Sequence, residues 1–169
     1  MISEYFKKYC SYYLSRYSVS KKKFEDILKK KIRKDFFSKK FDKTQYHQYL
    51  NEVDNIVSHY GKLGYLDDKR LIDIKVDNLI EKGFSRKKIY FYLKKNLFAD
   101  ELIKEKILDL EEIENLDFKL IKNYLKKKSF FNNNLYDISK KDYFDKILMK
   151  LIKEGFDIEV VKKFLRETK

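Results

Sequence analysis

The chain has 169 residues, of which 40 are Lys or Arg and 27 are Asp or Glu, so its formal net charge at pH 7 is +13. Proline is absent, glycine occurs four times and cysteine once, and 43% of the residues are apolar. This composition favours helices around a buried core and excludes an internal disulfide or a cysteine cluster. No apolar run approaches the roughly 18 residues that span a bilayer, and residues 1–8 lack the apolar segment of a signal peptide, so we expect a cytoplasmic protein.

Apolar residues recur at spacings of three and four, which predicts an all-α fold of nine helices. In chain order, the predicted apolar stripes cover residues 6–17, 24–32, 46–63, 71–80, 89–93, 102–110, 116–125, 143–152 and 160–165. The nine group as three units of three helices: repeat 1 over residues 1–66, repeat 2 over 67–113 and repeat 3 over 114–169. A basic connection is expected at Lys34–Lys43, and a loop at 130–138, where Asn132-Asn133-Asn134 favours turns.

A helix corner recurs along the chain. In Gly83-Phe84-Ser85 and Gly155-Phe156-Asp157, the glycine can take the left-handed backbone that ends a helix, and Ser or Asp can cap the next helix. The segment Gly64-Tyr65-Leu66-Asp67-Asp68 predicts a third corner of this kind. Such a unit cannot bury its apolar stripe alone, so copies are expected to stack as a helical array. Aligning the first two corners pairs further apolar residues, Ile89 with Val161 and Leu93 with Leu165.

The residues that could carry reactive or metal chemistry are few. Cys10 is expected to pack inside the first helix, the alternative being a reactive thiol. His47 and His59 are twelve residues apart, or about 18 Å along a helix, which is too far to share a metal. No Gly-rich phosphate loop and no nucleophile with a base is present. We therefore expect a protein that is not an enzyme, with no cofactor and no metal.

The positive charge lies at the two ends of the chain. Residues 1–63 contain 15 cations and 7 acids, residues 64–118 contain 11 and 13, and residues 119–169 contain 14 and 7. Such an excess favours binding to a polyanion such as nucleic acid, because neutralised phosphates release counterions. The alternative is the lysine enrichment of an AT-rich genome, which raises lysine everywhere but does not alone produce a net excess.

Aromatic and arginine residues are candidate nucleic-acid contacts. Tyr5, Tyr9, Tyr13 and Tyr17, spaced by four, favour helix packing over base stacking, whereas Phe130 and Phe131 beside the asparagine loop are better stacking candidates. Arginine occurs only five times, at positions 16, 33, 70, 86 and 166. Arg70 and Arg86 stand at predicted helix starts, where a forked guanidinium could bind a partner or, alternatively, pair with a nearby carboxylate such as Asp73.

These segments together resemble the RecX family, the bacterial regulators that restrain the RecA recombinase. The resemblance is carried by Gly64-Tyr65-Leu66-Asp67-Asp68-Lys69-Arg70-Leu71 and by Gly83-Phe84 through Leu93. Tyr13-Leu14-Ser15-Arg16-Tyr17-Ser18 before Lys21–Leu28 is similar to that family's opening helix pair, and Leu148–Leu165 with Gly155-Phe156 is similar to its final segment.

The resemblance implies an elongated, curved stack of three tandem three-helix repeats that lodges in the groove of a RecA filament on single-stranded DNA. It implies inhibition of filament extension, ATPase, strand exchange and repressor cleavage. The residues predicted to contact the partner or DNA are Arg70, Arg86, Lys87, Lys88, Lys94 and Lys95, supported by Lys21, Lys22, Lys23, Lys126, Lys127 and Lys128. A monomer is expected. The competing hypotheses are a helical nucleic-acid-binding regulator that acts without RecA, and a scaffold that binds proteins only.

Overall fold

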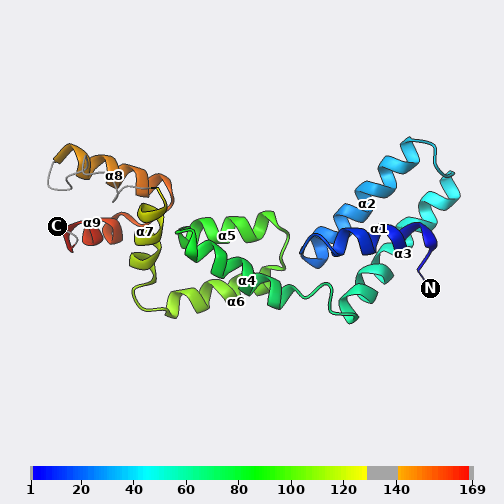
Figure 1. Cartoon of the computed structure of the whole chain (residues 1–169), viewed down its shortest axis with the longest axis horizontal. Coiled ribbons are helices and arrows are strands. Elements are labelled where there is room, and N and C mark those ends of the chain that lie inside the picture. Colours follow the sequence, from blue (N-terminus) through cyan, green and yellow to red (C-terminus); the bar gives the residue numbers. More distant parts are fainter. Residues whose placement is uncertain (1, 129–140, 168–169) are drawn as a thin grey trace. The chain divides into compact units, whose positions relative to one another are not determined.

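In a computed structural model, the chain is described over residues 2–128 and 141–167, with the side chains of 141–143 left out. Over these ranges the fold is all-α and contains no strand, which confirms the predicted fold class. The described helices (Figure 1) are α1 Glu4–Leu14, α2 Lys21–Phe37, α3 Lys43–Lys62, α4 Asp68–Glu81, α5 Arg86–Lys95, α6 Asp100–Glu112, α7 Leu116–Lys127, α8 Lys141–Lys153 and α9 Ile158–Glu167.

Two boundaries differ from the sequence prediction. Helix α1 ends at Leu14, so Tyr17 lies beyond it and is 53% exposed, although its ring still contacts that of Tyr13 at 4.9 Å. Five residues separate the helix end from Ser20, which takes an extended backbone and caps α2. Helix α2 continues into the expected connection as far as Phe37 and α3 begins at Lys43, which leaves only residues 38–42 between them.

The chain divides into two compact units. Unit 1 is Met1–Leu71 with Asn96–Ala99, and unit 2 is Ile72–Lys95 with Asp100–Lys169. The division into three repeats stays a prediction. No helix of the described residues is both long and apolar enough to cross a membrane.

Unit 1 has a core built from the facing sides of α1, α2 and α3. Tyr5, Tyr9 and Tyr13 pack against this core, as predicted for helix-packing residues, and Tyr5 stacks on Tyr49 at 4.4 Å. Cys10 is fully buried, and burial raises the pKa of its thiol to about 12, so the thiol is protonated at neutral pH. The core residues are Phe6, Cys10, Phe24, Leu28, Ile32, Val53, Ile56, Tyr60 and Leu66.

A carboxylate is buried at the edge of the unit 1 core. Asp35 is 3% exposed and accepts hydrogen bonds from the Tyr5 hydroxyl at 2.8 Å, from Lys31 at 2.7 Å and from Lys40 at 2.8 Å. Burial alone would raise the pKa of Asp35, but the hydrogen bonds from Lys31, Lys40 and Tyr5 outweigh it and hold the pKa well below its usual range. The charge is therefore retained and serves to connect α1, α2 and the following turn.

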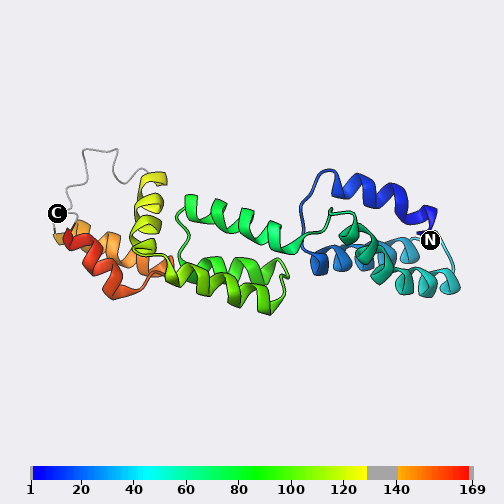
Figure 2. The ribbon, with the colours of Figure 1, turned by 90° about the horizontal axis from the view of Figure 1, so that it is seen from below.

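Unit 2 contains most of α4, followed by α5 to α9. Helix α5 packs against α6, and α9 packs against both α7 and α8 (Figure 2). Each helix buries residues at helical spacing, as its amphipathic pattern requires. The fully buried side chains include Ile89 and Leu93 of α5, Ile103 of α6, Leu120, Ile121 and Leu125 of α7, Leu151 of α8, and Val161 and Leu165 of α9.

Candidate nucleic-acid and partner interface

The three predicted glycine corners are present. Gly64, Gly83 and Gly155 have φ angles of +80°, +72° and +88°, the left-handed region that favours glycine. At each corner the glycine N–H donates to the carbonyl three residues earlier, and the following aromatic N–H donates to the carbonyl five residues earlier. This is the Schellman arrangement that satisfies the last carbonyls of a helix. The six bonds are Gly64–Gly61 3.0 Å, Tyr65–Tyr60 3.0 Å, Gly83–Ile80 2.9 Å, Phe84–Leu79 3.0 Å, Gly155–Ile152 2.9 Å and Phe156–Leu151 3.2 Å.

The predicted caps follow each corner. Asp67 accepts from the backbone N–H of Arg70 at 3.0 Å, Ser85 from that of Lys88 at 3.3 Å, and Asp157 from that of Val160 at 3.1 Å. The first corner differs in one respect, because it has an extra residue. There Leu66 is buried and Tyr65 is 61% exposed.

Asp68, the last residue of the first corner, joins two helix starts within unit 1. Its carboxylate accepts a hydrogen bond from the backbone N–H of Lys21 at 2.9 Å. Burial raises the pKa of Asp68, and the bond from Lys21 opposes this shift. The acidic pair Asp67-Asp68 therefore has a structural role: Asp67 caps α4, and Asp68 binds the backbone at the start of α2.

Gly83 is the most tightly enclosed of the glycines. A Cβ built there would lie 2.2 Å from the backbone nitrogen and 2.5 Å from the Cα of Tyr124. Asn123 adds a bond from its side-chain amide to the carbonyl of Ile80 at 2.9 Å. The corner between α4 and α5 therefore rests directly on the backbone of α7.

Two serine caps share a geometry that the sequence analysis did not identify. Ser20 and Ser85 are each 2% exposed, and each Oγ accepts from a backbone N–H three residues on, that of Lys23 at 3.2 Å or that of Lys88 at 3.3 Å. Each Oγ also donates to a carbonyl far along the chain: Ser20 to Asn96 and Ser85 to Glu154, both at 2.7 Å.

Aligning the sequence on these two serines reveals a repeated basic pattern. Setting Ser20 on Ser85 places Lys21–Lys23 on Arg86–Lys88 and Lys29-Lys30 on Lys94-Lys95. It also matches the buried anchors, Phe24 with Ile89 and Leu28 with Leu93. Aligning the glycine corners does not reveal this repeat, because no glycine precedes Ser20. The spacing of serine, three cations, an anchor, a second anchor and two lysines would have revealed it.

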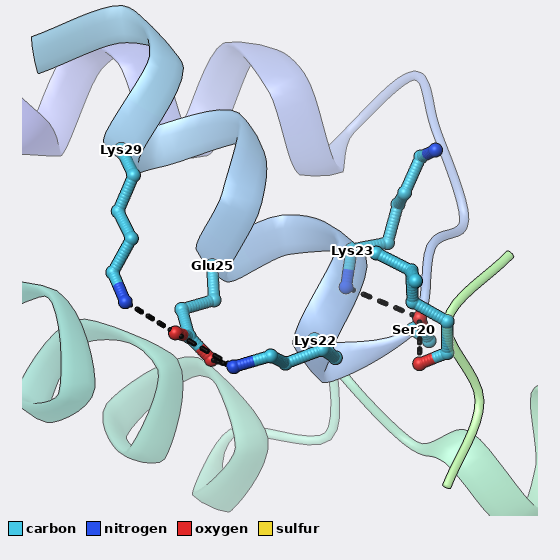
Figure 3. A network of polar contacts seen from close by, with 6 residues as sticks. Ser20, Lys22, Lys23, Glu25 and Lys29 are labelled. Carbon is cyan, nitrogen blue, oxygen red and sulfur yellow. Dashed lines mark hydrogen bonds and ion pairs between the residues drawn. The ribbon is translucent and has the colours of Figure 1, made fainter. Parts of the chain in front are cut away.

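In α2 two of the five repeated cations, Lys22 and Lys29, are paired with an acid of their own helix. Lys21 and Lys22 are exposed, and Lys23 is half-buried. Figure 3 shows Glu25 between Lys22 and Lys29, with ion-pair distances of 2.9 Å and 2.5 Å. The same view shows the bond from the Lys23 backbone to Ser20 that starts the helix.

In α5 three of the five predicted cations are engaged by carboxylates. Arg86 donates from Nε to Asp117 at 3.1 Å and also bonds Asp117 through Nη2. Lys88 pairs with Glu154, and Lys94 pairs with Asp100 at 2.7 Å. Arg86 thus pairs with a carboxylate of the chain, which was the predicted alternative to binding a partner. Lys87 and Lys95 are exposed and have no ion pair within the described part of the chain.

The remaining predicted cations lie on exposed helix surfaces. Arg70 is exposed and has no ion pair to a described residue, whereas Asp73, the partner considered for it, pairs with Lys106 at 2.5 Å. Lys126, Lys127 and Lys128 are exposed at the end of α7, where cations interact favourably with the helix dipole. These lysines can therefore stabilise α7 without binding a ligand.

Exposed aromatic rings lie on α5. Phe91 is 58% exposed and Tyr90 36% exposed, and their ring centroids are 5.4 Å apart in an edge-to-face arrangement. These rings were not among the predicted site residues, although the buried anchors Ile89 and Leu93 place Phe91 on the opposite side of the helix. The predicted stacking residues Phe130 and Phe131 lie outside the described residues.

Across residues 2–128 and 141–167, no group of three or more His, Cys, Asp or Glu side chains is placed to hold a metal ion. Comparison with family models, with curated proteins and with solved structures finds no significant match. The functional interpretation therefore rests on the residues of this chain.

Proposed function

We propose that this chain is a RecX-like regulator that binds RecA filaments on single-stranded DNA and inhibits the recombinase. Its targets are filament extension, ATP hydrolysis, strand exchange and coprotease activity, so it acts as a negative modulator of DNA recombination, DNA repair and the SOS response. The observation that supports this most is the segment Gly64-Tyr65-Leu66-Asp67-Asp68, which carries the resemblance and forms a capped left-handed corner in an all-helical chain.

Further support comes from the repetition of the glycine corner along the chain. The corners at Gly83 and Gly155 have the same hydrogen-bond pattern as that at Gly64, as expected of a repeat protein. Repeat proteins offer extended binding surfaces and need no catalytic centre. We therefore propose a cytoplasmic, monomeric binding protein without a cofactor, whose basic residues contact DNA or the recombinase.

The proposal is tested by binding to preformed RecA filaments and to bare single-stranded DNA in parallel at about 0.15 M salt. A filament regulator binds filaments tightly and bare DNA weakly. The predicted contact surface is tested with Arg70→Ala, whose side chain is exposed and unpaired among described residues. If Arg70→Ala and Arg86→Ala both leave filament and DNA binding unchanged, this surface is wrong.

The second candidate is a helical nucleic-acid-binding regulator that acts without RecA. The net charge of +13 favours it, because counterion release alone gives affinity for any nucleic acid. It predicts strong binding to bare DNA or RNA at physiological salt and no gain in affinity when RecA coats the strand. A protein-binding scaffold would show neither a strong salt dependence nor an effect on recombination.

A further inference from the structure

The repeated basic pattern differs in charge balance between α2 and α5. In α2, Glu25 bridges Lys22 and Lys29, and Asp26 follows it. In α5 the aligned positions are Tyr90 and Phe91, so its ten residues contain five cations and no acid. The two helices share anchors and cations, but α5 has aromatic rings where α2 has Glu25 and Asp26.

The geometry of α5 places these rings between cations. With about 3.6 residues per turn, Lys87 lies one turn before Phe91 and Lys95 one turn after it on the same side of the helix. Ile89 and Leu93 are fully buried and fix the inner side. We call the solvent side, made of Lys87, Tyr90, Phe91 and Lys95, the α5 face.

The ion pairs of unit 2 leave this face positively charged. Arg86 and Lys88 are engaged by Asp117 and Glu154, and Lys94 by Asp100. Lys87 and Lys95 are exposed without an ion pair to any described residue. An apolar protein partner would have to desolvate these charges, whereas a polyanion with aromatic faces matches both features.

We propose that the α5 face binds single-stranded nucleic acid, with bases stacking on Phe91 and Tyr90 and phosphates contacting Lys87 and Lys95. A duplex is disfavoured because its base faces already stack on one another and are closed to a side-chain ring. The inference deepens the proposed function and rests on it for the choice of DNA as the natural strand. The stacking surface itself does not require RecA.

The test uses the full chain and a fluorescein-labelled thymidine oligonucleotide, with fluorescence anisotropy over a salt series centred on about 0.15 M. Phe91→Ala is expected to weaken binding about 5- to 150-fold, the range found for losing one base–aromatic stack. Lys87→Gln is expected to reduce the slope of log K against log salt by about 0.7, the value for one phosphate contact on a single strand.

Matched controls come from α2. Phe37→Ala removes a ring that is 80% exposed, and Lys29→Gln removes a cation of α2 that is paired with Glu25 and is not among the predicted contact residues. Both are expected to leave affinity within about twofold, as surface changes outside a binding site do. Far-UV circular dichroism and thermal unfolding of all four variants show that each is folded.

The inference is overturned if the wild-type chain does not bind the oligonucleotide, if Phe37→Ala weakens binding as much as Phe91→Ala, or if duplex DNA competes as well as the single strand. RecA inhibition is measured separately with the wild type and Phe91→Ala. Oligonucleotide binding through Phe91 without RecA inhibition would support the α5 face and refute the proposed function. RecA inhibition without oligonucleotide binding would do the reverse.

Discussion

Replacing Gly83 by alanine tests how the repeated corner is built into the fold. The left-handed backbone at φ +72° costs a residue with a Cβ about 1–2 kcal/mol. The added Cβ would also lie 2.2 Å from the backbone nitrogen of Tyr124, which cannot rotate away as a side chain could. Overpacking of this kind typically adds about 1–3 kcal/mol, so we expect Gly83→Ala to lower the free energy of unfolding by about 2–5 kcal/mol.

Gly64→Ala separates the two contributions. Gly64 has a similar φ of +80°, but no atom lies within 4 Å of its Cβ position. Only the backbone cost of about 1–2 kcal/mol is expected there. Urea unfolding of both variants, followed by far-UV circular dichroism, gives the two losses. Equal losses, or a loss below about 1 kcal/mol for Gly83→Ala, would refute the contact between this corner and α7.

Three further predictions concern unit 1. Lys39, two residues beyond the end of α2, has a left-handed φ of 55°, so Lys39→Gly should raise the free energy of unfolding by about 1 kcal/mol in thermal unfolding, and a decrease would contradict this. Because the pKa of Asp35 is depressed, its stabilisation is complete above the unfolded value of about 3.9 and is lost as the pH falls below it. Asp35→Asn should therefore lower the free energy of unfolding by about 1–3 kcal/mol at neutral pH. When the urea midpoint of unfolding is measured as a function of pH, the variant should lose less stability than the wild type between neutral and acidic pH. An equal loss in both proteins would refute the stabilising role of the Asp35 charge. Burial raises the pKa of Cys10 to about 12, so its thiol should resist alkylation at about pH 8 until urea unfolds the chain, and fast labelling of the native protein would disprove its packing.

The features that the sequence predicted well are local ones. Helical periodicity and the left-handed preference of glycine depend on neighbouring residues, so the apolar stripes and the corners at Gly64, Gly83 and Gly155 could be read directly. The end of α1 was placed too late because Tyr17 continues the apolar spacing after the helix has stopped.

The features that could not be predicted depend on distant partners. Arg86 pairs with Asp117, 31 residues away, and Ser20 bonds the carbonyl of Asn96, 76 residues away. Nothing in the spacing of either residue specifies such a partner. Phe91 is different, because the anchors on either side of it already indicated an exposed ring.

We propose that this chain acts on the recombinase filament rather than on DNA alone. The most direct test of this proposal is single-stranded-DNA-dependent ATP hydrolysis by the RecA of the same organism, titrated with this protein at about 0.15 M salt. We expect inhibition at well below one molecule per RecA subunit. Inhibition that appears only once the DNA is saturated with this protein, or no inhibition at all, would contradict it.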